Sequence, residues 1–376
     1  MIKDKNFNSF KHTPRVLVAP LDWGLGHATR CIPIIFALVE HGCKVIIAAS
    51  GDTKNLLQKE FPALEFIDIK GYNIQYSRNK AWFMTRLFLQ FPKLLVRIIY
   101  EKQWLKRAIV DYKINAVISD NRLGLSNGSI SSIYITHQLL IKTGNRFTEN
   151  VAQKIHYYFI NKYNSCWVPD WAAVNNLAGN LSHPIKLPAI PVTYLGPLSR
   201  FKASTEKIKY DCCFILSGPE PQRSILEDII LKEVQNYNGQ TLIVRGLPQQ
   251  NQLPAINNPL VEIKNHLASV ELSKVMQQSK IIISRCGYST IMDLVSIRKK
   301  AVLIPTPGQT EQEYLATYLG EKKFFVIVNQ NEFSLTDIFK RVDDFAFTLL
   351  NPQNNLLDDT IKSFVTETFN INNSNT

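Results

Sequence analysis

The sequence lacks the features that mark several common classes of protein. Its six cysteines form no C-x-x-C pair, so we expect neither a zinc site nor a redox motif of that spacing. It contains no run of about 18 uncharged apolar residues, so we expect no membrane-spanning helix. Residues 1–15 are basic but hold no apolar segment, and a signal peptide is therefore not expected.

Acidic residues are also in the minority. The chain has 31 Asp and Glu against 43 Lys and Arg, which gives a net charge of +12. Such an excess predicts an anionic partner: nucleic acid, a ligand with phosphate groups, or an acidic membrane surface. The 376 residues, 45% of them hydrophobic, suffice for two globular domains of about 100–200 residues each. We expect a cytoplasmic protein, with attachment to a membrane surface as one option.

The sequence opens with the pattern of a parallel α/β sheet. Residues 15–20 form a short apolar run typical of a buried strand, and a glycine-bearing turn follows at 21–26. A helical pattern then covers residues 28–40, with Gly42 just beyond its end, and 44–49 is a second apolar run. This β-turn-α-β unit predicts a doubly wound sheet.

The rest of the chain divides into two parts at a proline-rich strip, residues 187–197, which favours an extended connection. We therefore predict an N-terminal domain of residues 1–200 and a C-terminal domain of residues 201–376, each built from a Rossmann-like sheet. The last helix, 358–369, is assigned to the second domain. The further predicted strands are 65–69, 115–119 and 133–136 in the first half, and 211–217, 241–245, 261–264, 281–284 and 301–305 in the second.

The first glycine turn carries a histidine at the expected start of a helix. Gly24 and Gly26 would let the backbone approach a ligand closely, but Thr29 replaces the third glycine of a dinucleotide fingerprint. His27 lies at the carboxyl end of a strand, where open α/β sheets bind ligands. The helix dipole disfavours the charged imidazole, so His27 is a candidate base. The alternative is a hydrogen-bonded histidine with a purely structural role.

A second turn lies at residues 284–293, where a predicted strand runs through Gly287 into a helix. Ser289 or Thr290 is the expected N-cap, and the free backbone N–H groups of the turn would cradle a phosphate. Asp293 stands one turn into the helix. Because Thr290-x-x-Asp293 also fits a capping box, a structural role for this carboxylate is the alternative.

A third polar segment, residues 304–314, is a Pro/Gly loop that opens another helix. Gln312 and Glu313 stand in the first turn of that helix, where their side chains can hydrogen-bond sugar hydroxyls. A solvated first turn is the structural alternative. Residues 284–316, SRCGYSTIMDLVSIRKKAVLIPTPGQTEQEYLA, unite the second and third segments. Their order and spacing resemble the donor signature of the glycosyltransferase family 28 group of GT-B enzymes, with Arg298-Lys299-Lys300 where the family has a glycine.

The resemblance implies a GT-B fold, two Rossmann-like domains facing across a cleft, and a nucleotide-sugar site in the second domain. It implies that the turn at 287–290, with Ser289, holds the diphosphate and that Asp293 holds the ribose. Gln312 and Glu313 would contact the donor sugar. The resemblance extends to three further places: His266 and Leu267 for the nucleobase, Ser217 and Gly218 for the phosphates, and Gly24, Gly26 and His27 on the acceptor side.

Two more features of the first half bear on function. Asp120 ends a predicted strand and is a second candidate base, with a buried structural carboxylate as its alternative. Residues 78–113 hold nine basic and two acidic residues beside an apolar helical face that includes Leu94 and Ile98. This basic amphipathic segment, which we expect Pro92 to split into two helices, suits an anionic membrane interface, although a core-facing stripe fits equally well.

We therefore predict an inverting hexosyltransferase that moves a sugar from a nucleotide sugar, a UDP-sugar by the resemblance, to an acceptor hydroxyl that a lipid could carry. No cofactor or metal is expected, since no D-x-D motif occurs and a helix N-terminus can stabilise the leaving diphosphate. Three alternatives stay open: a UDP-sugar 2-epimerase of the same fold, a non-catalytic nucleic-acid-binding protein, and a GT-B scaffold without activity. The second lacks any recognition motif, so no nucleic-acid partner is expected.

Overall fold

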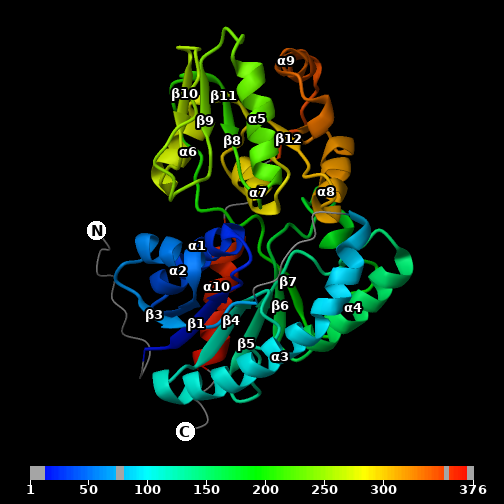
Figure 1. Cartoon of the computed structure of the whole chain (residues 1–376). Helices are drawn as coiled ribbons and strands as arrows, with labels where there is room; N and C mark the ends of the chain where they lie inside the picture. Colours follow the sequence, from blue (N-terminus) through cyan, green and yellow to red (C-terminus); the bar gives the residue numbers. More distant parts are fainter. Residues whose placement is uncertain (1–12, 73–79, 351–354, 371–376) are drawn as a thin grey trace. The chain divides into compact units, whose positions relative to one another are not determined.

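The computed structural model describes residues 13–72, 80–350 and 355–370, apart from the side chains of residues 80–91 and 370. Figure 1 shows a parallel sheet covered by helices in each half of the chain.

The chain divides into two compact units. The N-terminal unit comprises Met1–Val174, Asn180–Leu198 and Gln353–Thr376, and the C-terminal unit comprises Asn175–Gly179 and Ser199–Pro352. The last helix therefore belongs to the N-terminal unit, and its assignment to the second domain was wrong.

The N-terminal unit is built on a seven-stranded sheet in the order β3-β2-β1-β4-β5-β6-β7, with every neighbouring pair parallel. The central strands are apolar and β-branched because helices cover both faces of the sheet. The order reverses between β1 and β4, where a ligand crevice forms in folds of this kind. The strands are β1 (Arg15–Pro20), β2 (Lys44–Ala49), β3 (Glu65–Asp68), β4 (Ala116–Asp120), β5 (Ser131–Ile135), β6 (Ser165–Val168) and β7 (Val192–Tyr194).

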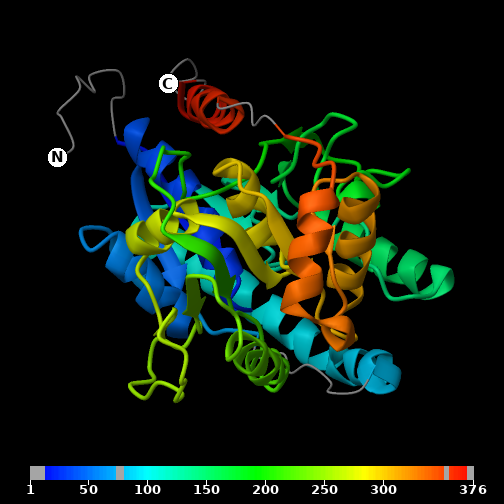
Figure 2. The ribbon, with the colours of Figure 1, turned by 90° about the horizontal axis from the view of Figure 1, so that it is seen from above.

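In the part of this unit that the structure describes, five α-helices accompany the sheet. They are α1 (Leu25–Glu40), α2 (Gly51–Glu60), α3 (Lys80–Tyr112), α4 (Arg146–Ile160) and α10 (Leu356–Asn370), with a short 3₁₀ turn at Gly179–Leu181. Helix α10 packs against α1, at the opposite end of the sequence, and Figure 2 shows it in red. His41, the C-cap of α1, contacts Asp358 of α10 at 2.8 Å between Nε2 and Oδ1.

Two helices of this unit differ from the prediction. Helix α1 begins at Leu25, three residues earlier than expected, so Gly26 and His27 lie inside its first turn. Helix α3 runs unbroken from Lys80 to Tyr112 with Pro92 inside it, so the expected split into two helices was wrong. A proline removes one backbone hydrogen bond, and a helix whose inner face is buried, as at Ile98 and Leu105, can continue past that loss.

The C-terminal unit has a six-stranded sheet in the order β10-β9-β8-β11-β12-β13, again parallel throughout. Its strands are β8 (Tyr210–Ile215), β9 (Thr241–Val244), β10 (Val261–Lys264), β11 (Ser279–Arg285), β12 (Ala301–Ile304) and β13 (Val326–Ile327). Its helices are α5 (Gln222–Val234), α6 (Ser269–Gln277), α7 (Tyr288–Ser296), α8 (Thr310–Glu321) and α9 (Leu335–Asp344), with a 3₁₀ turn at Gln330–Glu332.

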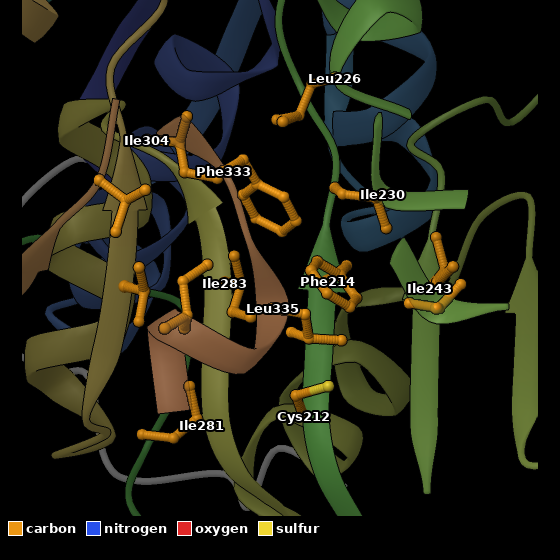
Figure 3. Close-up of a cluster of buried hydrophobic side chains, with 14 of the residues drawn as sticks. Cys212, Phe214, Leu226, Ile230, Ile243, Ile281, Ile283, Ile304, Phe333 and Leu335 are labelled. Carbon is orange, nitrogen blue, oxygen red and sulfur yellow. The ribbon is translucent and has the colours of Figure 1, made fainter. Parts of the chain in front are cut away.

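The core of this unit lies between the sheet and helices α5 and α9. Figure 3 shows Phe214, Ile283 and Ile304 on neighbouring strands, with Leu226 of α5 on one side. Leu335, the first residue of α9, is 2% exposed and packs in the same cluster. The order of this sheet reverses between β8 and β11, so both units have a topological switch point beside their first strand, where ligands bind in folds of this kind.

Candidate functional site

The crevice of the N-terminal unit brings together residues that are far apart in the sequence. Strands β1 and β4 pair in register up to Pro20 and Asp120, so the turn after β1 lies beside the end of β4. Gly24 has a φ of 80° and caps α1, and His27 follows in the first helical turn. Nδ1 of His27 lies 3.2 Å from Oδ2 of Asp120, so the two candidate bases form one pair.

Arg30, which the sequence analysis did not select, completes this cluster. It stands one turn after His27 on α1, and its guanidinium binds both carboxylate oxygens of Asp120, with Nε 2.8 Å from Oδ2. Its Nη2 also lies 2.8 Å from Nδ1 of His27, and its Nη1 lies 3.3 Å from Nδ1 of His137, which follows β5. The i, i+3 spacing of His27 and Arg30 on one helix could have indicated a role for Arg30. Its main partner, Asp120, is 90 residues away in the sequence.

Burial and charge set the protonation of this cluster. Burial would raise the pKa of Asp120, but Arg30 and His27 together hold it well below its usual range. Burial lowers the pKa of His27, and the guanidinium of Arg30 lowers it further, against the opposing effect of Asp120. His27 is therefore neutral and Asp120 ionised at neutral pH. The side chain of His27 is 14% exposed, whereas that of Asp120 is fully buried.

A hollow of about 640 Å³ opens at the carboxyl ends of β1, β2 and β3, and its lining includes Gly24 and Leu25, which precede His27 in the chain. Its floor includes the glycine turn at Gly24 and the first turn of α2, which begins at Gly51. Two cations, Lys70 and Arg97, and two carboxylates, Asp22 and Asp52, also line it. Every residue that lines the hollow belongs to the N-terminal unit.

In the C-terminal unit two turns follow the strands between which the sheet order reverses, β8 and β11. Ser217 and Gly218 follow β8 and are exposed, and Gly218 has a φ of 101° with open space where a side chain would lie. Gly287 follows β11 and caps α7, with no side-chain capping bond. Because α7 begins at Tyr288, the predicted N-cap at Ser289 or Thr290 was wrong, and both residues lie in the first turn. That the backbone N–H groups of this turn bind an anion stays a prediction.

Asp293 does not serve as the capping residue of α7. Its carboxylate Oδ1 accepts a 2.5 Å hydrogen bond from the hydroxyl of Ser199, which stands at the start of the C-terminal unit's main segment. Burial raises the pKa of Asp293 to about 6, and Ser199 and Arg200 oppose that rise. The capping-box alternative therefore does not describe this carboxylate.

The remaining predicted donor residues lie on two loops of the same unit. Gln312 and Glu313, at the start of α8, turn back onto the preceding loop, where their side-chain oxygens accept hydrogen bonds of 2.9 Å from the backbone N–H groups of Thr306 and Gly308. His266 and Leu267 lie in the loop between β10 and α6, with His266 exposed. Their roles toward a ligand stay predictions.

Comparison with known proteins shows what residues 223–366 are similar to. Residues 223–366 match the glycosyltransferase family 28 C-terminal domain. Most of the C-terminal unit is thus similar to a glycosyltransferase domain of family 28. The resemblance found in residues 284–316 is thereby confirmed, as is the assignment of the chain as a glycosyltransferase.

Curated relatives extend the likeness of this glycosyltransferase into the N-terminal unit. A protein of Listeria monocytogenes serovar 1/2a is 23% identical over 314 residues, which cover 76% of this chain and 84% of that protein. One of Clostridium tetani is 23% identical over 82% of this chain and 83% of its own. A Prochlorococcus marinus protein is 33% identical over only 28% of this chain and 30% of that one. Each is named UDP-N-acetylglucosamine–N-acetylmuramyl-(pentapeptide) pyrophosphoryl-undecaprenol N-acetylglucosamine transferase.

Solved structures confirm the GT-B fold of the glycosyltransferase. The glycotransferase of kitacinnamycin superposes with a TM-score of 0.61 at 13% identity and covers 96% of both chains. MurG of Acinetobacter baumannii gives a TM-score of 0.51 at 14% identity over 93% of this chain and 94% of its own. Neither these proteins nor the curated relatives support the 2-epimerase or nucleic-acid-binding alternatives.

Proposed function

We propose that this glycosyltransferase moves a hexose or N-acetylhexosamine from a UDP-sugar to a hydroxyl of a lipid-linked acceptor, with inversion and without a metal. The family 28 match over residues 223–366 carries the proposal, because it includes the turn after β11 and the helices α7 and α8 that hold the predicted donor residues. Relatives that align with most of the chain are named for a UDP-N-acetylglucosamine donor and an undecaprenol-linked acceptor.

The donor would bind by its diphosphate at the N-terminus of α7. As the sugar bond breaks, negative charge grows on the leaving phosphate, and the preorganised N–H groups after Gly287 stabilise it without reorganising. At Gly218 open space lies where a side chain would stand, which leaves room for phosphate oxygens close to the backbone. Asp293 would accept hydrogen bonds from the ribose hydroxyls.

The base for the acceptor hydroxyl would be His27. A base at Nε2 needs its lone pair free there and its proton on Nδ1, where Oδ2 of Asp120 can accept it at 3.2 Å. The acceptor would lie in the neighbouring hollow of about 640 Å³. A general base contributes roughly 10²–10⁴ to the rate.

We also propose that the N-terminal unit binds an anionic membrane surface through the outer faces of α3 and α4. Among the residues that the structure describes, no helix is long and apolar enough to cross a bilayer. The predicted apolar face of α3 is buried at Ile98 and half-buried at Leu94, while its residues 83–91 lie outside the described side chains. From Ile98 onward the core-facing alternative therefore holds.

The opposite face of α3 offers different side chains to solvent. Val96 and Ile99 are 65% and 56% exposed. Lys102 and Lys106 continue that face, and burial together with Lys162, beyond α4, lowers the pKa of Lys102, so these lysines lie close together. The outer face of α4 adds exposed apolar side chains, Phe147 and Tyr158 among them. Apolar side chains among lysines suit insertion into an anionic leaflet.

A thermal-shift series would test the donor. A UDP-sugar at about 100 times its Kd should add about 2.7 kcal/mol of stability, and GDP- and dTDP-sugars much less. Transfer to a polyprenyl-diphosphate-linked sugar should follow, with the same rate after treatment with EDTA. Equal shifts with all three nucleotides, or no transfer from the stabilising sugar nucleotide, would contradict the proposal.

A further inference from the structure

One ring nitrogen of His27 has two neighbours with opposite requirements. Oδ2 of Asp120, at 3.2 Å from Nδ1, can only accept a hydrogen bond, because the carboxylate is ionised. Nη2 of Arg30, at 2.8 Å from the same Nδ1, can only donate one. Nδ1 carries either a proton or a lone pair, so it satisfies one neighbour and opposes the other.

The position of Arg30 is set independently of His27. Its Nε donates to Oδ2 of Asp120 at 2.8 Å, its Nη2 also contacts Oδ1, and its side chain is 4% exposed. A bidentate arginine–carboxylate pair holds the guanidinium plane rigidly. Nη1 lies 3.3 Å from Nδ1 of His137, which must likewise accept. Arg30 thus presents fixed donors to two histidines.

The shorter contact and the competition for Asp120 favour one tautomer. Oδ2 of Asp120 already accepts from Arg30, and a proton on Nδ1 of His27 would face an arginine N–H donor at 2.8 Å. We propose that Arg30 is a positioning residue that keeps the resting enzyme's His27 in the Nε2–H tautomer. The catalytic meaning of this inference rests on the proposed function. The tautomer that can act as a base, in which Nδ1–H of His27 donates to Asp120, is the minor form in the resting enzyme.

Nitrogen NMR of the full chain tests the tautomer without any substrate. With seven histidines in the sequence, long-range ¹H–¹⁵N correlation resolves the rings, and His27→Gln assigns the signal that disappears. The wild type should show a bare Nδ1 and a protonated Nε2 at His27. Arg30→Lys keeps the charge but loses the fork, so the proton should move to Nδ1. A wild-type His27 protonated at Nδ1, or the same tautomer in both proteins, overturns the proposal.

The pH profile separates a positioning role from a merely structural one. The groups that act on His27 are Arg30, Asp120 and His137, and Arg30 lowers its pKa. Removing the charge with Arg30→Met should therefore move the acid limb of kcat/KM to higher pH by roughly one unit or more, while Arg30→Lys leaves it near the wild type. An unmoved limb in a folded Arg30→Met protein contradicts the assignment.

The two proposals fail separately. If no sugar transfer is found but the tautomer moves in Arg30→Lys, the role of Arg30 stands and the proposed function fails. If transfer is found and His27 rests as the Nδ1–H form, the proposed function stands and the role of Arg30 fails.

Discussion

The hydroxyl of Ser199 donates a 2.5 Å hydrogen bond to Oδ1 of Asp293, the carboxylate expected to hold the donor ribose. Ser199 lies 94 residues before Asp293 and also accepts a bond from the backbone N–H of Phe201. Ser199, the first residue of the main segment of the C-terminal unit, therefore contacts the predicted donor site of the same unit. Ser199, which belongs to none of the sequence motifs, thus orients the carboxylate of Asp293 that would bind the ribose.

Replacing Asp293 should weaken nucleotide binding more than folding. A charge-assisted hydrogen bond contributes roughly 1.5–3 kcal/mol, so Asp293→Ala should raise the Kd for UDP by about 10- to 150-fold in calorimetry. Ser199→Ala is the matched control: it removes the 2.5 Å bond but keeps the carboxylate, and UDP affinity should change only a few-fold. An Asp293→Ala protein that melts early yet binds UDP normally would make this carboxylate structural.

Asp293 should also give the protein a specific pH dependence. Its pKa is raised by burial to about 6 from an ordinary 3.8, so the native state binds this proton more tightly than the unfolded state does. The stability it contributes is full at low pH and is lost as pH rises from about 4 through 6. Urea unfolding should therefore show that the free-energy difference between wild type and Asp293→Asn falls over this range; a constant difference would contradict the shifted pKa.

Loss of His27 should affect turnover without affecting the donor. His27→Ala should lower kcat by roughly 10²–10⁴, with UDP-sugar affinity unchanged, because the predicted base and donor residues lie in different units. His41→Ala, at the other end of α1, is the control and should keep full turnover. If His27→Ala turned over normally, the base would have to be Asp120 or another group.

Neutralising three lysines, two on α3 and one just beyond α4, should release the enzyme from anionic vesicles. Each basic residue near such a surface contributes about 1 kcal/mol, so replacing Lys102, Lys106 and Lys162 with Gln should weaken binding about 100-fold in a sedimentation assay. The matched control replaces three lysines of the C-terminal unit, Lys232, Lys274 and Lys340. If both triple variants bound alike, or the wild type never bound at low salt, the surface on α3 and α4 would be excluded.

Arg298, in the stretch Arg298-Lys299-Lys300 that replaces a glycine of the family, has a left-handed backbone conformation. Its φ is 55°, just after α7, where its N–H bonds the carbonyl of Val295. A non-glycine residue with such a φ costs roughly 1–2 kcal/mol. Arg298→Gly should therefore be about 1 kcal/mol more stable in urea unfolding than Arg298→Ala, which loses the same side chain without relieving the strain. Equal stabilities would contradict the strain at this position.

The local sequence alone determined the elements and the donor signature. Short β-branched runs, glycine turns and helical periods predicted the strands around Gly24 and Gly287, because each pattern is satisfied within a few residues. The motif of residues 284–316 identified the family for the same reason. The predicted helix boundaries were wrong where packing overrode a local rule: α3 continues through Pro92, and α1 begins earlier than predicted.

Only the tertiary structure decided which of these elements meet. The pairing of β1 with β4 brings Asp120 to His27. It joins residues 100 positions apart and leaves no local period in the sequence. The return of α10 to α1 and the bond from Ser199 to Asp293 are of the same kind. Such contacts form because buried polar groups must find hydrogen-bond partners anywhere along the chain. The central place of Arg30 in the site therefore follows only from the fold, which puts Asp120 beside it.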